Sequence, residues 1–155
     1  MLYDESRWKP MISEILEPIV WTNAHLIGNK AIDDDHRKLV LLFNELLAVC
    51  SAGADSAIIG RTLEAAITLT REHFNREEDV LQASGYPRLQ AHRQEHQVLL
   101  KQLVAFGAQL TGGAPMSVDP NVVGFLREWA IRHILGHDRE YAAYLQQNSL
   151  EESGI

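Results

Sequence analysis

Residues 56–85 read SAIIGRTLEAAITLTREHFNREEDVLQASG, and the pattern in this stretch decides the fold. One face, at alternating spacings of four and three residues, is mostly apolar, as on a helix that buries one side. This seam consists of Ile59, Leu63, Ala66, Thr70, His73, Glu77 and Val80. Asp55 and Ser56 are good N-cap residues and Gly85 is a C-terminal stop signal, so the pattern predicts one long helix between them.

Three more segments share this helical periodicity. They run from Asp34 to Gly53, from Tyr86-Pro87 to Thr111-Gly112-Gly113, and from Asp119-Pro120 to about Asn148. Short turns between four long helices favour antiparallel neighbours, so we expect an all-α, up-down-up-down four-helix bundle over residues 31–148. Residues 1–30 are interrupted by prolines and are expected to form an ordered N-terminal arm with at most one short helix, and residues 149–155 a frayed tail.

Composition excludes several function classes. The chain has 155 residues, the length of one domain, and its 46% hydrophobic and 23% charged residues are ordinary for a globular protein. Its formal net charge of −7 argues against nucleic-acid binding, because a phosphate backbone would be repelled. With one cysteine, no signal-peptide pattern and no run of about 18 apolar residues, the chain is expected to be cytoplasmic and not inserted in a membrane.

Polar residues occupy seam positions that a bundle core normally fills with apolar side chains. They are His36, His73, Glu77, His92, His96 and His133. Burying such groups without partners costs on the order of several kcal/mol for a carboxylate, whereas metal ions accept both imidazole nitrogen and carboxylate oxygen as ligands. The pairs His73/Glu77 and His92/His96 are one helical turn apart, so each pair can converge on one centre. His25 and His137 are interpreted as ordinary histidines and left out of this site.

Four motifs occur in order along the chain. They are Gly28-x-x-x-Ile32-Asp33-x-x-His36, His73-Phe74-x-x-Glu77-Glu78, His92-x-x-x-His96 with Glu95, and Trp129-x-x-x-His133-Ile134-x-x-x-Asp138. Through them the chain resembles, from about Trp21 to Tyr141, the bacterial hemerythrins, which are non-haem di-iron dioxygen carriers built as four-helix bundles.

The resemblance implies a ligand set for two iron ions joined by an oxo or hydroxo bridge. It makes His92, His96 and His133 the terminal ligands of one ion and His36 and His73 those of the other, with Glu77 and Asp138 bridging the pair. Asp138 lies five residues after His133, whereas His137 has the more natural four-residue spacing. We follow the resemblance and expect Gly136 to allow a local distortion of the fourth helix.

The resemblance also implies a mechanism, which is reversible binding of dioxygen as a hydroperoxide at the five-coordinate iron. Such binding needs an apolar wall that excludes water, and its candidate residues are Leu39, Phe74, Trp129, Ala130 and Ile134. The family usually has leucine at the position of Ala130, so a roomier pocket and faster oxidation to the ferric state are expected. The expected role is a carrier or sensor for oxygen storage, delivery or sensing rather than an enzyme. Nitric oxide is a second candidate ligand, and residues 1–18 are a candidate surface for a protein partner.

Two other interpretations stay open at this point. His92-Arg93-Gln94-Glu95-His96 matches the H-x-x-E-H signature of inverted zinc metallopeptidases, but that motif leaves the other seam histidines unexplained. A carboxylate-rich di-iron oxidase or peroxidase would use Glu-x-x-His pairs, and the chain contains none.

Overall fold

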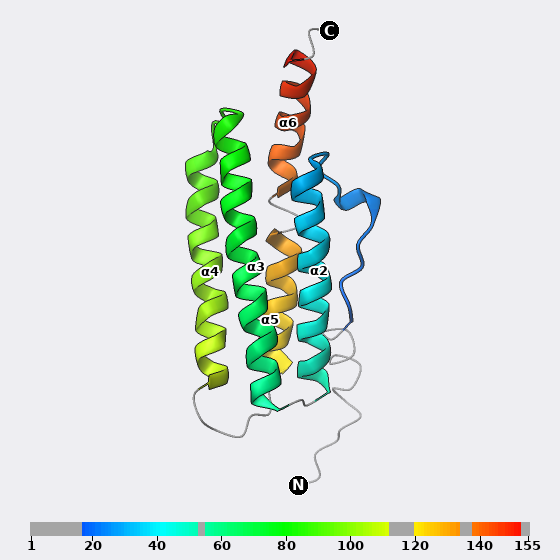
Figure 1. The fold of residues 1–155 in the computed structure, drawn as a ribbon, viewed down its shortest axis with the longest axis vertical. Helices are drawn as coiled ribbons and strands as arrows, with labels where there is room; N and C mark the ends of the chain where they lie inside the picture. Colours follow the sequence, from blue (N-terminus) through cyan, green and yellow to red (C-terminus); the bar gives the residue numbers. More distant parts are fainter. Residues whose placement is uncertain (1–16, 53–54, 112–119, 134–137, 153–155) are drawn as a thin grey trace.

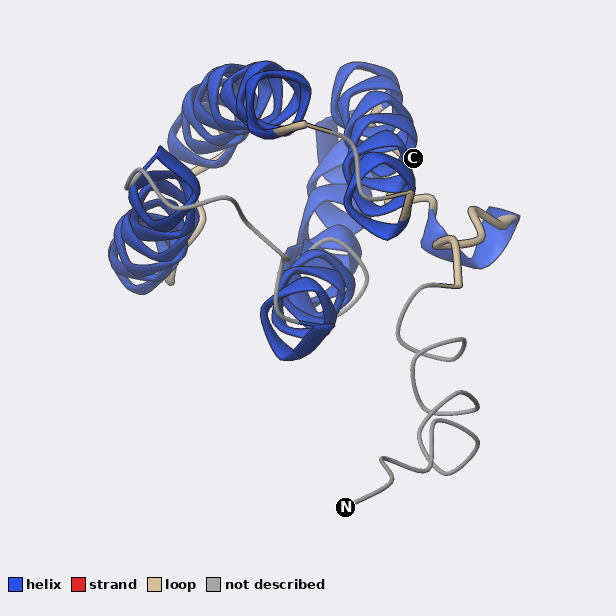
Figure 2. Cartoon of the chain, turned by 90° about the horizontal axis from the view of Figure 1, so that it is seen from below, coloured by secondary structure: helices blue, strands red, loops and turns tan. Residues whose placement is uncertain are grey.

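The structure, a computed structural model, describes residues 17–52, 55–111, 120–133 and 138–152. Its elements are a short 3-10 helix η2 (Asn23–His25) and the helices α2 (Lys30–Ser51), α3 (Ser56–Ala83), α4 (Leu89–Thr111), α5 (Pro120–Ala130) and α6 (Asp138–Glu152). Along the bundle, α2, α3, α4 and the leg that contains α5 and α6 alternate in direction (Figure 1). Viewed end-on, α2, α3, α4 and the leg formed by α5 and α6 surround a common interior (Figure 2). The all-α, up-down-up-down bundle predicted from the sequence is confirmed.

Helix ends follow local capping chemistry. Asp55 caps α3 as expected, because its side chain accepts a hydrogen bond from the backbone N–H of Ile58 at 3.0 Å. After α3, Gly85 adopts φ +70° and the N–H of Tyr86 bonds the carbonyl of Leu81 at 3.0 Å, which closes the helix with a left-handed turn. α2 begins at Lys30, earlier than the Asp34 expected, because the Asn29 side chain caps the N–H of Ile32.

The fourth leg of the bundle is not one continuous helix. α5 ends at Ala130, residues 131–133 have the wider π-helical backbone, and α6 starts at Asp138. The distortion expected from the sequence is therefore present, but it begins before Gly136, which lies outside the described residues. α6 continues to Glu152, beyond the expected end near Asn148.

Residues 17–29 of the arm are tied to the bundle by polar contacts. The backbone of Ile19 makes two hydrogen bonds with the side chain of Asn44 on α2, at 2.7 and 2.9 Å. The backbone N–H groups of Ile27 and Gly28 both donate to the carboxylate of Asp33, at 2.8 and 3.2 Å. These contacts agree with an ordered arm, while the exact division of the chain into arm, bundle and tail stays a prediction.

Two apolar clusters fill the interior, and the polar seam residues lie between them. One cluster centres on Leu39, Phe43, Leu63, Phe106 and Trp129, and the other on Ile27, Ile32, Leu81, Tyr86 and Tyr141. Along α2, His36 falls between Ile32 of one cluster and Leu39 of the other. The bundle therefore has a polar layer with an apolar cluster on each side. No helix among the described residues has the length and apolar character needed to cross a membrane.

Candidate metal centre

The six polar seam residues are all buried and come together in one layer. His36, His73 and Glu77 are 0% exposed, His133 is 1%, His96 is 3% and His92 is 7%. They come from α2, α3, α4 and the π-helical turn that follows α5. The sequence-based expectation that these side chains turn inward together holds for all six.

Glu77 lies at the centre of the layer. Its Oε2 is 3.0 Å from Nε2 of His73 and 3.7 Å from Nε2 of His36. Its Oε1 is 3.1 Å from Nε2 of His96 and also contacts Nε2 of His92 closely. Each carboxylate oxygen therefore faces a pair of imidazole nitrogens.

The charge on Glu77 follows from these contacts. Burial alone would raise the pKa of this carboxyl group, but hydrogen bonds to His36, His73, His92 and His96 outweigh burial and hold the pKa well below its usual range. Glu77 is consequently an anionic oxygen donor in the middle of the interior.

The donor set fits two metal ions. In the part of the chain that the structure describes, there are two groups of three residues whose possible ligand atoms all lie within 4.8 Å of one another. One group is His36, His73 and Glu77, and the other is Glu77, His96 and His133. His36 and His73 also place their Nε2 atoms 3.1 Å apart, where two lone pairs can share a cation. A carboxylate shared by two histidine groups is the arrangement expected of a bridging ligand.

Part of the expected site lies outside the described residues. Ile134 and His137 belong to residues 134–137, and of Asp138 the structure describes only the backbone, which begins α6 directly after the interruption of the fourth leg. The bridging role of Asp138 and the wall role of Ile134 stay predictions.

Two carboxylates contact the Nδ1 atoms of two of the site histidines, on the side of each ring that faces away from Glu77. Asp35 Oδ2 is 3.2 Å from Nδ1 of His73, and Glu78 Oε2 is 3.3 Å from Nδ1 of His96. An Nδ1–H that donates to a carboxylate leaves Nε2 as the inward-facing lone pair, which is how metal-binding histidines are usually oriented. Although burial raises the pKa of Asp35, its hydrogen bond to His73 and the charges of His73 and Arg76 hold that pKa below its usual value.

Sequence reasoning missed the role of these two residues. Asp35 directly precedes His36 and Glu78 directly follows Glu77, so each stands next to a seam residue in the chain. That adjacency was the only signal, because the partner of each carboxylate is on a different helix.

The aromatic residues of the expected apolar wall lie mostly against His96 and His133. Phe74 stacks on the ring of His96, with centroids 3.8 Å apart and planes 2° apart, and meets His133 edge-on at 4.8 Å. The ring centroids of Trp129 and His133 are 6.2 Å apart, and Trp129 donates its indole N–H to the carbonyl of Leu99. Leu39 and Ala130 are buried in the same apolar cluster. Near His36 the structure adds Trp21 of the arm, with ring centroids 6.4 Å apart.

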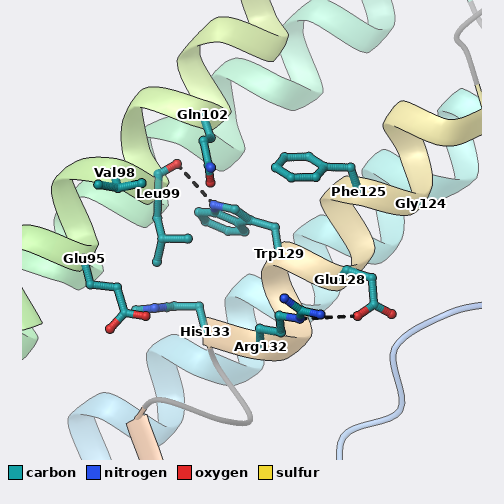
Figure 3. A pocket seen from close by; sticks show the side chains of 10 residues that line it. All are labelled: Glu95, Val98, Leu99, Gln102, Gly124, Phe125, Glu128, Trp129, Arg132 and His133. Atoms are coloured by element: carbon teal, nitrogen blue, oxygen red, sulfur yellow. Dashed lines mark hydrogen bonds and ion pairs between the residues drawn. The ribbon is translucent and has the colours of Figure 1, made fainter.

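A cavity of about 470 Å³ opens between α4 and α5 and reaches this wall (Figure 3). Trp129 and the buried His133 line its inner part, and the exposed Phe125 and Val98 lie nearer its mouth. The side chain of Glu95 points toward the ring of His133 (Figure 3).

Two points left open by the sequence, the position of His25 and the zinc-peptidase interpretation, can be compared with this geometry. His25 lies outside the polar layer, in η2, where its Nδ1 accepts the backbone N–H of Thr22 at 3.0 Å. In the H-x-x-E-H segment, both histidines, His92 and His96, face Glu77. The side chain of Glu95 points toward His133 rather than toward a separate zinc position (Figure 3). The peptidase interpretation leaves the contacts of His36, His73 and Glu77 unexplained.

Comparisons with known proteins agree with this geometry. The family model for the hemerythrin HHE cation binding domain matches residues 27–145. A bacteriohemerythrin of Stenotrophomonas maltophilia is 29% identical over 137 residues, covering 86% of this chain and 88% of the relative. Myohemerythrin-1 of Phascolopsis gouldii is 29% identical over 133 residues, covering 85% of this chain and 98% of the relative. A crystal structure of a hemerythrin with a leucine-to-alanine substitution aligns with a TM-score of 0.72 at 28% identity, covering 81% of this chain and 95% of that one.

Proposed function

This chain belongs to the hemerythrin family, and on that premise we propose that it binds dioxygen reversibly at a centre of two iron ions. The observation that carries the proposal is the position of Glu77, whose two oxygens face His36 and His73 on one side and His92 and His96 on the other. A single buried carboxylate between two histidine groups suits two cations better than one.

Each residue has a defined part in the proposed centre. His92, His96 and His133 hold one ion, His36 and His73 hold the other, and Glu77 bridges the pair. Asp138 is the second bridge. This choice follows the five-residue spacing of His133 and Asp138, and it is supported by the π-helical backbone at residues 131–133, because such wider turns are frequent at functional sites.

Two iron(II) ions held by these residues would supply the two-electron chemistry of reversible dioxygen binding. The protein keeps this binding reversible. Asp35 and Glu78 retain the Nδ1 protons of His73 and His96, so the Nε2 lone pairs stay directed inward. Phe74, Leu39, Trp129 and Ala130 are all buried and would keep water away from the bound gas. With two histidines rather than three, the His36 and His73 side would leave a position open for the gas.

The physiological role that we propose for this site is oxygen storage, delivery or sensing. Nitric oxide is the second diatomic gas that the vacant position would accept. A sensing role needs an output partner, for which residues 1–18 are the proposed surface.

The cavity of Figure 3 favours one second candidate function, the oxidation of a small organic molecule. At about 470 Å³ it is far larger than a diatomic gas needs, and its lining reaches His133. Turnover of a reductant or of peroxide with such a molecule would identify an oxidase or peroxidase instead of a carrier.

Metal analysis combined with visible spectra tests the proposal. We expect two irons per chain and a charge-transfer band that appears in air and disappears when the sample is deaerated again. The variant His73→Asn should lose the band, whereas His25→Asn, which removes a histidine outside the polar layer, should keep it. One zinc per chain with peptide hydrolysis, or a band that never reverses, would contradict reversible dioxygen binding.

A further inference from the structure

An arginine stands behind one of the two carboxylates that hold the site histidines. Nη1 of Arg76 lies 2.6 Å from Oδ1 of Asp35, while Oδ2 of the same carboxylate is 3.2 Å from Nδ1 of His73. Arg76 and His73 are on α3 and Asp35 is on α2, so these contacts connect the two helices. They form a chain of four groups that starts at the surface with Arg76 and ends at Glu77, whose Oε2 is 3.0 Å from His73 Nε2.

The equivalent series of contacts to His96 on α4 has a longer arginine–carboxylate distance and a more exposed carboxylate. Nε of Arg93 lies 3.3 Å from Glu78 Oε1, and Glu78 Oε2 lies 3.3 Å from Nδ1 of His96. Arg93 also donates to the side chain of Gln82 at 3.1 Å, so its guanidinium is shared. The Glu78 side chain is 20% exposed, whereas that of Asp35 is 4% exposed.

Burial makes the contact with Arg76 important for the orientation of Asp35. A carboxylate that is almost out of water must be held by protein donors, and each oxygen of Asp35 has a different one. If Oδ1 loses the guanidinium, the carboxylate can rotate to find another donor and Oδ2 leaves His73. The imidazole then has no fixed acceptor at Nδ1 and can adopt the other tautomer, in which Nε2 carries the proton and no longer offers a lone pair.

We propose that Arg76 is a positioning residue of the metal centre, which acts through Asp35 to keep the Nε2 lone pair of His73 directed inward on the two-histidine side. This inference rests on the proposed function, because the ion that His73 would hold is one of the two irons proposed above. The two-histidine side has fewer protein nitrogens than the other side, so its ion depends more on the orientation of each.

Iron retention against a chelator tests the proposal. Chains loaded with iron(II) without oxygen are dialysed against increasing concentrations of an iron(II) chelator. Arg76→Gln should release one of its two irons at roughly 10-fold lower chelator concentration than the unaltered chain, the lower end of the usual effect of an outer-shell change. Arg76→Lys, which restores the charge and one donor, should recover part of this difference. Arg71→Gln, the same change at an exposed position of α3, should behave like the unaltered chain.

Imidazole ¹⁵N spectra of the metal-free chain give an independent readout, with the His73 signals assigned from His73→Asn. We expect His73 to keep its proton at Nδ1 in the unaltered chain and in Arg71→Gln, whether or not its Nε2 also donates to Glu77, and we expect Arg76→Gln to show a second population without a proton at Nδ1. Retention of both irons together with an unchanged tautomer in Arg76→Gln would overturn the proposal. Loss of both irons at once, with a lower melting temperature of the metal-free chain, would also overturn it, because that is general loosening. If the unaltered chain takes up no iron, the proposed function fails, and the tautomer of His73 alone decides the role of Arg76.

Discussion

Ala130 is the residue whose side chain we expect to have the most direct effect on how long the proposed centre keeps bound oxygen. It is fully buried, directly after Trp129, in the apolar cluster next to the polar layer. A small side chain at a position where the family usually has leucine leaves more room for water.

We expect Ala130→Leu to slow the oxidation of the oxygenated form to the ferric state, because the larger side chain excludes water. Overpacking should cost about 1–3 kcal/mol of unfolding free energy. Stopped-flow or scanning spectroscopy of the decaying charge-transfer band measures the rate. Ala65→Leu, at an exposed position of α3, is the matched control. An unchanged or faster rate in Ala130→Leu would contradict the roomier-pocket explanation.

Cys50 should be a poorly reactive thiol. Burial raises its pKa to about 11, so the thiolate, which is the nucleophile, is roughly one thousandth of the total at pH 8. We expect alkylation by iodoacetamide to be slow at pH 8 and to accelerate about tenfold per pH unit until the pH approaches that pKa. Cys50→Ala/Ser51→Cys, with the thiol at an exposed neighbouring position, should react faster at pH 8. Equal rates for the two chains would show that burial does not control this thiol.

At the residue scale, the sequence predicted the inward-facing ligands but not the residues that hold them. His36, His73 and Glu77 violate the apolar pattern of their seams, and that violation is visible in the sequence alone. Asp35 and Arg76 occupy ordinary polar positions, and the contact between them spans 41 residues of chain. Such a pairing depends on how α2 and α3 pack, which periodicity does not specify.

Among the elements, α2 has a second function as the support of the N-terminal arm. Asn44 bonds both backbone groups of Ile19, and Ile19 is itself a buried member of the apolar cluster. The arm in turn places Trp21 near His36.

Asn44→Ala should therefore loosen the arm. It leaves the N–H and carbonyl of Ile19 without this partner, at a cost of about 1–3 kcal/mol of unfolding free energy. We expect faster amide hydrogen exchange at residues 19–21 and altered fluorescence of Trp21. Asn75→Ala, at an exposed position of α3, should change neither. Unaltered exchange in Asn44→Ala would mean that the arm is held by its apolar contacts alone.

The boundaries of α3 were predictable because its capping signals are local, whereas the Asn29 cap of α2 was missed. The Asp55 cap and the Gly85 stop of α3 are both sequence signals, and both are present in the structure. The interruption after α5 was expected only from the five-residue spacing of His133 and Asp138. Its start at residues 131–133 could not be derived, because no proline or glycine marks those positions.

For the molecule as a whole, the metal ions should contribute to folding stability. Five imidazoles and a carboxylate lie in one interior layer, and ions that bind only the folded chain stabilise it by mass action.

We expect the melting temperature to rise as iron(II) is added to the metal-free chain without oxygen. The gain should be about 2.7 kcal/mol of unfolding free energy at a free iron concentration 100 times the dissociation constant. Magnesium, which prefers oxygen ligands and octahedral hydration, should give no comparable rise. Equal stabilisation by magnesium, or none by iron, would exclude the polar layer as a transition-metal site.

The polar layer with an apolar cluster on each side has a further consequence for how the bundle comes apart. Within the ranges that the structure describes, the buried apolar side chains form two separate clusters: Ile32, Leu81 and Tyr141 belong to one, and Leu39, Leu63 and Phe106 belong to the other. Bound cations would therefore connect the two apolar clusters through the polar layer, so that the metal-loaded chain melts in a single calorimetric transition. Without its ions, the same chain should melt in two steps, because its two apolar clusters can then come apart separately.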